Sequence, residues 1–275
     1  MTSGPAAATR AVPVATILAA VLLTGCSTTP FGAPTNIAVR AEKGYLSAAD
    51  LDALVEAVPA PSADGSAEQV ADRTLSDRYR GLERSDRWLL ATAHAELSPE
   101  LARQHFDCAL GVRFAATPTP RLTQVLTRLM ADADAVAERA KARALRPRPV
   151  SVDPNRPACQ RLTATQRNSG SYPSGSAAVG TAYAEVMATL DPAHAPAARE
   201  IGHQIATSRL VCAMHYPADA AAGEAVGRQV FARAATTPAF AADIAAAQLE
   251  LAQVRATGLT QAGCAAERAA LAMSL

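Results

Sequence analysis

One segment, "LTQVLTRLMADADAVAERAKARAL", limits the fold more than any other part of the chain. Its apolar side chains recur at steps of three and four residues, which places them on one face of a helix: Leu122, Val125, Leu126, Leu129, Ala133 and Val136. A strand needs alternation with a period of two, and no stretch shows it convincingly. Beyond residue 45 helix-forming Ala, Leu, Arg, Glu and Asp dominate, while only 4% of the whole chain is aromatic. The pattern predicts an all-α fold.

The same reasoning places helices along the rest of the chain. Ser47 with Asp50 resembles a capping box, and Ser98-Pro99 puts proline at a first helical position. The expected helices cover 47–58, 66–95, 98–110, 119–145, 175–190, 196–213, 217–235, 238–255 and 260–273. The longest gap, 146–173, is rich in proline and polar residues. Because long loops in compact domains are usually functional or disordered, and this one joins two suggestive segments, we expect it to be functional.

Residues 1–25 are predicted to be a lipoprotein signal peptide. Arg10 is their only charge, and the apolar run "AVPVATILAAVLL" is too short to span a membrane as a stable helix. It leads into "LTGC", in which two small residues precede Cys26. We expect Cys26 to become the lipidated N-terminus and to tether the protein to a membrane; an ordinary signal peptide is the alternative.

The rest of the chain divides into a tether and one domain. Residues 26–45 are rich in Pro, Gly and Thr, as flexible linkers are, and 46–275 are long enough to bury one good core. Ser27, and no aspartate, follows the lipidated cysteine. A residue other than aspartate at this position favours sorting to the outer membrane. We expect the domain to lie at the periplasmic face of a bacterial membrane, with the outer membrane favoured.

Charge and cysteine content narrow the function classes. The chain has 26 Lys and Arg against 25 Asp and Glu, so it lacks the basic excess of a nucleic-acid-binding protein. With Cys26 set aside for lipidation, four cysteines remain, and an even number in an exported protein predicts two disulfides. Three pairings remain open among Cys108, Cys159, Cys212 and Cys264.

Two segments carry groups suited to an anion. In "KARALRPRP", Lys141 and Arg148 could converge on a phosphate dianion, although basic helix C-termini are common for electrostatic reasons alone. In "GSYPSGS", a helix starts near Gly175, and its free amides would face the contents of the loop. Simple N-capping by Ser174 or Ser176 is the alternative.

A third segment, "SRLVCAMHYPAD", contains a possible nucleophile. Arg209 could bind phosphate oxygens in bidentate fashion, and His215 and Asp219 lie four residues apart, on one side of a helical backbone. A carboxylate that accepts one imidazole N–H leaves the other nitrogen free to attack. A buried histidine bonded to an acid for structural reasons is the alternative.

Together, in order and spacing, the segments resemble the bacterial class A nonspecific acid phosphatases of the type 2 phosphatidic acid phosphatase superfamily. That family has Lys, six residues, Arg-Pro; then Pro-Ser-Gly-His; then Ser-Arg, five residues, His, three residues, Asp. The matching residues here are Lys141, Arg148-Pro149, Pro173-Ser174-Gly175-Ser176, Ser208-Arg209, His215 and Asp219. The flanking "GSYPSG" and "PAFAADIAAAQLELA" are also similar, and the resemblance spans roughly residues 70 to 255.

The resemblance implies a compact, single-domain helical bundle with the site at one end. It also implies hydrolysis of small phosphate monoesters, with no metal or other cofactor. His215 would attack phosphorus to give a phosphohistidine, and Asp219 would orient it. The phosphoryl oxygens would be bound by Lys141, Arg148, Arg209, Ser174 and the amide of Gly175.

Ser176 departs from the family pattern at the histidine that protonates the leaving group. A serine hydroxyl is too weak an acid for that task, and general acid catalysis typically contributes about 10²–10⁴-fold. We therefore expect a weakened phosphatase or one selective for good leaving groups. A non-catalytic phosphate-binding lipoprotein is the main alternative. Vanadate-dependent oxidation is a third, which the loss of the same histidine also disfavours.

Other histidines and two nearby substitutions bear on the same point. Ala213 stands where the family usually has glycine, and Tyr216 where it has tryptophan. We do not expect a substitute proton donor among the remaining histidines, because a lone helical histidine is more often structural: His94, His105, His194 and His203.

Overall fold

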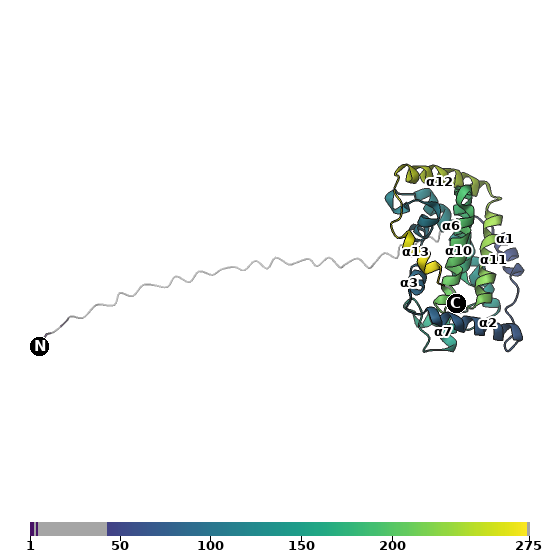
Figure 1. The fold of residues 1–275 in the computed structure, drawn as a ribbon, viewed down its shortest axis with the longest axis horizontal. Helices are drawn as coiled ribbons and strands as arrows, with labels where there is room; N and C mark the ends of the chain where they lie inside the picture. The colour runs from purple at the N-terminus through teal and green to yellow at the C-terminus, as the bar shows by residue number, and fades with distance from the viewer. Residues whose placement is uncertain (3, 5–42, 274–275) are drawn as a thin grey trace, which may run out of the picture. The chain divides into compact units, whose positions relative to one another are not determined.

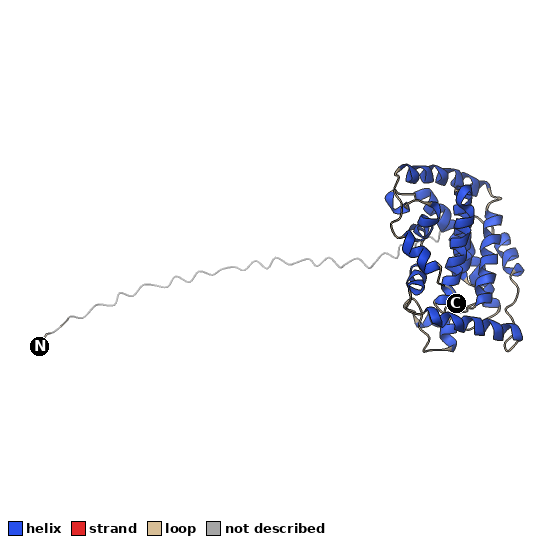
Figure 2. Cartoon of the chain, viewed as in Figure 1, coloured by secondary structure: helices blue, strands red, loops and turns tan. Residues whose placement is uncertain are grey.

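The computed structural model describes residues 1–2, 4 and 43–273, and those from 43 onward belong to one compact unit. This part of the chain contains helices and loops and no strand, which confirms the all-α prediction (Figure 2). Cys26 and nearly all of the predicted signal peptide and tether lie outside the described residues.

The long helices are α1 Ala48–Ala57, α2 Ala67–Arg78, α3 Asp86–Ala93, α6 Pro120–Arg143, α9 Gly175–Leu190, α10 Ala195–Val211, α11 Pro217–Ala234, α12 Pro238–Ala256 and α13 Cys264–Leu271. Shorter helical turns connect them: η1 Tyr79–Leu82, α4 Pro99–Ala102, η2 Arg103–Phe106, α5 Asp107–Leu110, η3 Phe114–Ala116, α7 Pro149–Val152, α8 Ala164–Asn168 and η4 Pro192–His194. In Figure 1, α12 and α2 lie across opposite ends of the bundle, and α10 and α11 run between them.

Most predicted helices are present, but the one expected over 66–95 is interrupted. Its two parts, α2 and α3, are separated by η1 and a turn in which Arg84 has φ of 62°, a left-handed conformation. Ser85 then caps α3 by accepting the Trp88 N–H. The sequence contains this second start as Ser85-Asp86, a cap followed by an acidic first-turn residue, which the continuous prediction overlooked.

Helix α9 is the central element of the bundle. It packs against α6, α10 and α11, and its buried side chains point in all directions around the axis. A helix that is apolar on every side is stable only when neighbours cover every side. The mostly small side chains of α9 permit that enclosure, and its N-terminus is thereby held at one end of the bundle.

Two glycines let α11 approach α9 very closely. A Cβ on Gly223 would lie 2.3 Å from the carbonyl oxygen of Ser174, and one on Gly227 would lie 2.3 Å from that of Ala178. No side chain fits at such distances, so only glycine permits this backbone contact. The contact brings the start of α11 against the start of α9.

The predicted loop 146–173 is partly helical, because α7 and α8 form single turns within it. Two disulfides are present, as predicted, and the structure selects one of the three pairings. Cys108 is joined to Cys264, and Cys159 to Cys212. The second bridge attaches this segment to the C-terminal end of α10.

Within the described residues, no helix is both long and apolar enough to cross a membrane. The same residues contain no group of three or more His, Cys, Asp or Glu side chains that could hold a metal ion.

Candidate active site

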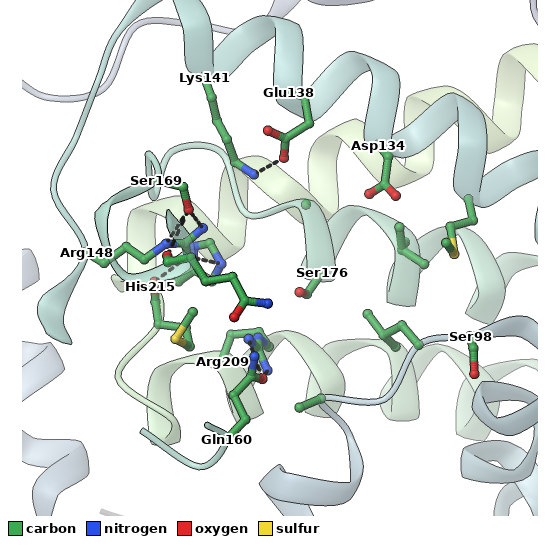
Figure 3. Close-up of a pocket in the computed structure, with 17 residues that line it drawn as sticks. Ser98, Asp134, Glu138, Lys141, Arg148, Gln160, Ser169, Ser176, Arg209 and His215 are labelled. Atoms are coloured by element: carbon green, nitrogen blue, oxygen red, sulfur yellow. Dashed lines mark hydrogen bonds and ion pairs between the residues drawn. The ribbon is translucent and has the colours of Figure 1, made fainter. Parts of the chain in front are cut away.

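A cavity of about 370 Å³ opens where the C-terminal parts of α6 and α10 meet the N-terminus of α9 (Figure 3). Segment 146–173 contributes further side chains to its wall. Most of the site residues predicted from the sequence line it: Lys141, Arg148, Gly175, Ser176, Arg209 and His215. The other two predicted residues, Ser174 and Asp219, are buried beside it and are not part of its lining.

The N-terminus of α9 forms one wall of the cavity. Ser174 caps the helix, since its Oγ accepts the Ala177 N–H at 3.2 Å, and its own N–H donates to the carbonyl of Asp219 at 2.9 Å. Gly175 and Ser176 occupy the first turn, where backbone amides have no partner within the helix. These amides and the positive end of the helix dipole favour an anion in the cavity.

A tight turn at the end of α10 joins the predicted cation to the predicted nucleophile. The Met214 N–H donates to the carbonyl of Arg209 and the Ala213 N–H to that of Leu210, both at 3.0 Å. This is the Schellman pattern, which requires a left-handed residue, and Ala213 supplies it with φ of 56°. The His215 N–H donates to the same Arg209 carbonyl at 3.3 Å. The turn therefore holds His215 at a set position relative to Arg209.

Arg209 is a buried cation without an acidic partner among the described residues. Its side chain is 3% exposed, its Nη atoms reach only Gln160 Oε1 at 3.4 Å, and its Nε makes no hydrogen bond. Burial lowers its pKa to about 10, and nearby Arg148 contributes, so the guanidinium remains charged in neutral or acidic solution. Burying a charge in this way is costly unless an anion compensates it.

Arg148 and Lys141 bring two more cations to the cavity. Arg148 donates to the carbonyl of Met214 at 2.9 Å and to Ser169 Oγ at 3.0 Å. Burial lowers its pKa. Lys141 is paired with Glu138, which lies one helical turn before it and is largely exposed. The three cations come from α6, from α10 and from the segment between α6 and α9.

His215 has one nitrogen held and the other directed at a cation. Its Nδ1–H donates to the carbonyl of Ser171 at 2.7 Å, and Arg148 Nη1 donates to Nε2 at 3.0 Å. Burial lowers the pKa of His215 well below its usual range, and Arg148, Arg209 and Lys141 act in the same direction. The imidazole is therefore neutral, with a lone pair on Nε2 beside the cations. That is the form required of a nucleophile.

The expected hydrogen bond from His215 to Asp219 is not formed, which corrects the sequence interpretation. Asp219 Oδ2 lies 3.9 Å from Nδ1, and its closer partners are the Tyr216 N–H and Arg146 Nη1, both at 2.7 Å. Burial raises the pKa of Asp219 to about 6, and Arg146 opposes that shift. Because the Ser171 carbonyl accepts the Nδ1 proton, Asp219 acts on His215 through its charge at 3.9 Å and by supporting the turn beneath it.

Sequence reasoning missed several residues of the site. Arg146 lies within the basic segment that drew attention, but its role as a buried partner of Asp219 and Asp72 depends on tertiary contacts. Ser171 acts through its backbone, so its side chain carried no signal. Asp134 lines the cavity two turns before Lys141, at a spacing that the helical pattern already contained.

None of the four histidines considered as substitute proton donors lines the cavity. His94 is buried against Ser208 Oγ at 2.9 Å, with His105 packed edge-on against it. His194 pairs with Asp191, and His203 with Glu224. These contacts are structural. Of the residues considered for proton donation, Ser176 alone lines the cavity with the predicted nucleophile His215.

No family model matches the chain, but individual curated proteins do. An acid phosphatase of Zymomonas mobilis is 31% identical over 210 residues, which cover 76% of this chain and 79% of that protein. A non-specific acid phosphatase of Salmonella typhimurium is 30% identical over 194 residues, covering 70% of this chain and 77% of its own length. One of Providencia stuartii is 26% identical over 199 residues, with 72% and 80% covered. Similarity over this much of each chain extends well beyond the motifs of the cavity, and the chain therefore belongs to the acid phosphatase family.

Proposed function

We propose that this protein is a phosphomonoesterase that works through a phosphohistidine on His215, with a preference for good leaving groups. The observation that carries the proposal is the pairing of a neutral imidazole with Arg148 and Arg209 in one cavity. A buried arginine without an acidic partner suits an anionic substrate, and the adjacent Nε2 lone pair suits attack on phosphorus. The acid phosphatase relatives support phosphomonoesterase activity. The resemblance of the motifs to the superfamily supports the phosphohistidine mechanism.

In the proposed mechanism the cations and the α9 amides bind the phosphoryl oxygens. Arg209 and Arg148 supply several N–H donors with fixed directions, Lys141 adds a point charge, and Gly175 lines the cavity in the first turn of α9. Phosphoryl transfer depends mainly on such positioning and charge stabilisation. The Nε2 of His215 forms a bond to phosphorus as the ester oxygen leaves, and the Ser171 carbonyl stabilises the positive charge that develops on the ring. Water then displaces the phosphoryl group and restores the imidazole.

Ser176 sets the expected limit on this activity. A histidine at the start of α9 would protonate the leaving oxygen, and a serine hydroxyl cannot do so at a useful rate. Aryl phosphates, whose leaving groups are stable anions, are then better substrates than alkyl phosphates. The same feature supports a second candidate function, a phosphate-binding protein without turnover.

A phosphohistidine trap separates the two functions. Purified protein is mixed with labelled 4-nitrophenyl phosphate, quenched in alkali and analysed for a base-stable, acid-labile adduct. We expect an adduct with the unmodified protein and none with His215→Ala. Binding of inorganic phosphate without adduct or turnover would instead establish the binding protein.

We also propose that the protein is exported and anchored at the periplasmic face of a membrane, preferably the outer one, through lipid on Cys26. The signal sequence pattern supports this, and the balance of charges supports no nucleic-acid partner. Mass spectrometry of the N-terminal peptide from membranes would reveal acylated Cys26. An unacylated N-terminus at another residue would contradict the anchor.

A further inference from the structure

Asp134 lines the cavity but has no role in the mechanism proposed for His215 and the cations. Asp134 is on α6, seven residues before Lys141, so the two side chains lie on the same face two turns apart. Its Oδ1 would lie 3.7 Å from a Cβ placed on Gly175, which directly precedes Ser176. Figure 3 shows Asp134 on the side of Ser176 away from His215 and Arg148. The carboxyl group thus occupies the leaving-group side of the cavity.

Asp134 differs from its neighbour Glu138 in its contacts. Glu138 is exposed and paired with Lys141, whereas Asp134 is half-buried and makes no hydrogen bond within the described residues. Met130 lies four residues before Asp134 on α6, and Val179 lies one turn after Gly175 on α9. Their apolar side chains and that of Leu97 line the cavity and offer a carboxylate no solvation. A carboxyl group in such surroundings favours its protonated form.

The charged and titratable groups around Asp134 do not reverse that preference. Burial raises the pKa of Asp134 to about 6; Lys141 opposes the shift and Glu138 adds to it. On α9, Tyr183 is a titratable neighbour of Asp134; it donates to the Leu97 carbonyl, and burial raises its pKa, so it is neutral.

Across the cavity stand the cations of the phosphoryl end, Arg148 and Arg209, with neutral His215. A bound phosphoryl group would offset the positive charge of these arginines. Asp134 would then face an anion, which does not favour the carboxylate form. In mildly acidic solution the carboxyl group is therefore protonated and able to donate.

We propose that Asp134 is the proton donor to the leaving group, at the position where the family resemblance leads one to expect a histidine. This rests on the proposed phosphatase function. Replacement of imidazole by the small side chain of Ser176 leaves space between the ester oxygen and the carboxyl group. The proton passes directly from the carboxyl group to the ester oxygen.

Proton transfer from Asp134 accompanies transfer of the phosphoryl group to His215. The Nε2–P bond forms while the P–O bond to the leaving group breaks, and the electron pair of that bond stays on oxygen. Asp134 gives its proton to this oxygen, so a neutral alcohol departs and a carboxylate remains. In the second step the carboxylate takes a proton from the attacking water, the P–N bond breaks and phosphate leaves. Asp134 is then protonated again.

The test compares one aryl and one alkyl substrate in Asp134→Asn. We expect kcat/KM for butyl phosphate at pH 5 to fall about 100-fold or more, and that for 4-nitrophenyl phosphate to fall less than about 5-fold. Both rates come from one preparation, so their ratio is independent of the fraction folded. In the unmodified protein the butyl phosphate rate should decline above about pH 6, and this decline should be absent from the residual activity of Asp134→Asn.

Glu138→Gln is the matched control, because it removes a carboxylate from the same face of α6 and the same cavity. It should change the two substrates by equal factors. The double variant Asp134→Asn/Ser176→His should regain butyl phosphate turnover, since an imidazole then supplies the proton. Equal losses on both substrates in Asp134→Asn, or none, would overturn the proposal while phosphohistidine formation still supported the phosphatase. Absence of adduct and turnover in the unmodified protein would overturn both.

Discussion

The two ends of the cavity are built in opposite ways. At the phosphoryl end, Arg148, Arg209 and His215 are buried and held by backbone carbonyls, a helix-terminal turn and each other. At the leaving-group end, Asp134 and Ser176 stand among apolar side chains with few polar contacts. A site that binds one invariant group, the phosphoryl, gains from rigid preorganisation. The end that would meet varied leaving groups has no such requirement, and Ser176 stands there where the resemblance of the motifs implies a histidine.

Removing a cation from the phosphoryl end should have the largest effect and should not distinguish substrates. In Arg209→Met, kcat/KM for aryl and alkyl phosphates should fall together by about 10²–10³-fold, because one fixed donor set for the transition-state oxygens is lost. Steady-state kinetics on both substrates measures this. Arg209→Lys keeps the positive charge but lacks the paired N–H donors of the guanidinium. It should recover part of the lost kcat/KM, by the same factor for aryl and alkyl phosphates. A loss confined to alkyl phosphates would show that the two ends are not separate in function.

The pH dependence should separate the two ends without any mutation. His215 must be neutral to attack, and because its pKa is lowered well below its usual range, it stays active through mildly acidic pH. Asp134 must be protonated to donate, so its contribution is present below about pH 6 and lost above it. Alkyl phosphate turnover should thus fall toward tenfold per pH unit above that value, while aryl turnover stays nearly level. Parallel profiles for the two substrates from pH 4 to 8 would contradict the assignment.

Adding a histidine should strengthen only the leaving-group end. Ser176→His should raise alkyl phosphate turnover at pH 7 by roughly 10-fold or more, since imidazole is partly protonated there, and should leave 4-nitrophenyl phosphate nearly unchanged. The ratio of the two kcat values measures the effect. Ser176→Ala is the control: because the hydroxyl is not the acid, it should lower both rates only slightly. An equal gain on both substrates from histidine would point to better phosphate binding.

The smallest expected effect concerns the turn behind the phosphoryl end. Ala213 adopts a left-handed conformation that costs a non-glycine residue about 1 kcal/mol. Ala213→Gly should therefore raise the free energy of unfolding by up to about 1 kcal/mol, with kcat nearly unchanged, as measured by urea denaturation. Ala206→Gly, in the middle of α10, should instead lower it by about that amount or more. A stability loss in Ala213→Gly would show that the methyl group packs usefully in its buried position.

Much of the fold could be predicted because each helix carries local signals. The apolar stripe of α6 and the capping box at Ser47 both appear where expected. The break between α2 and α3 was missed although Ser85-Asp86 marks the second start, because the left-handed Arg84 that ends the first part has no reliable sequence signature. The pairing of cysteines could not be predicted either: sequence order does not say which sulfur atoms the packed helices bring together.

For the site, the sequence by itself determined which residues lie at the proposed phosphoryl end of the cavity. The types and spacing of Lys141, Arg148, Arg209 and His215 were sufficient to predict a shared site, and all four line one cavity. The tertiary structure decided which hydrogen-bond partners these residues have. It assigned the Nδ1 proton of His215 to a backbone carbonyl in place of Asp219, and it bound Asp219 to Arg146. It also brought Asp134 beside Ser176. Hydrogen bonds and burial depend on which elements pack together. Contacts between segments that are far apart in the sequence cannot be predicted from any one short segment.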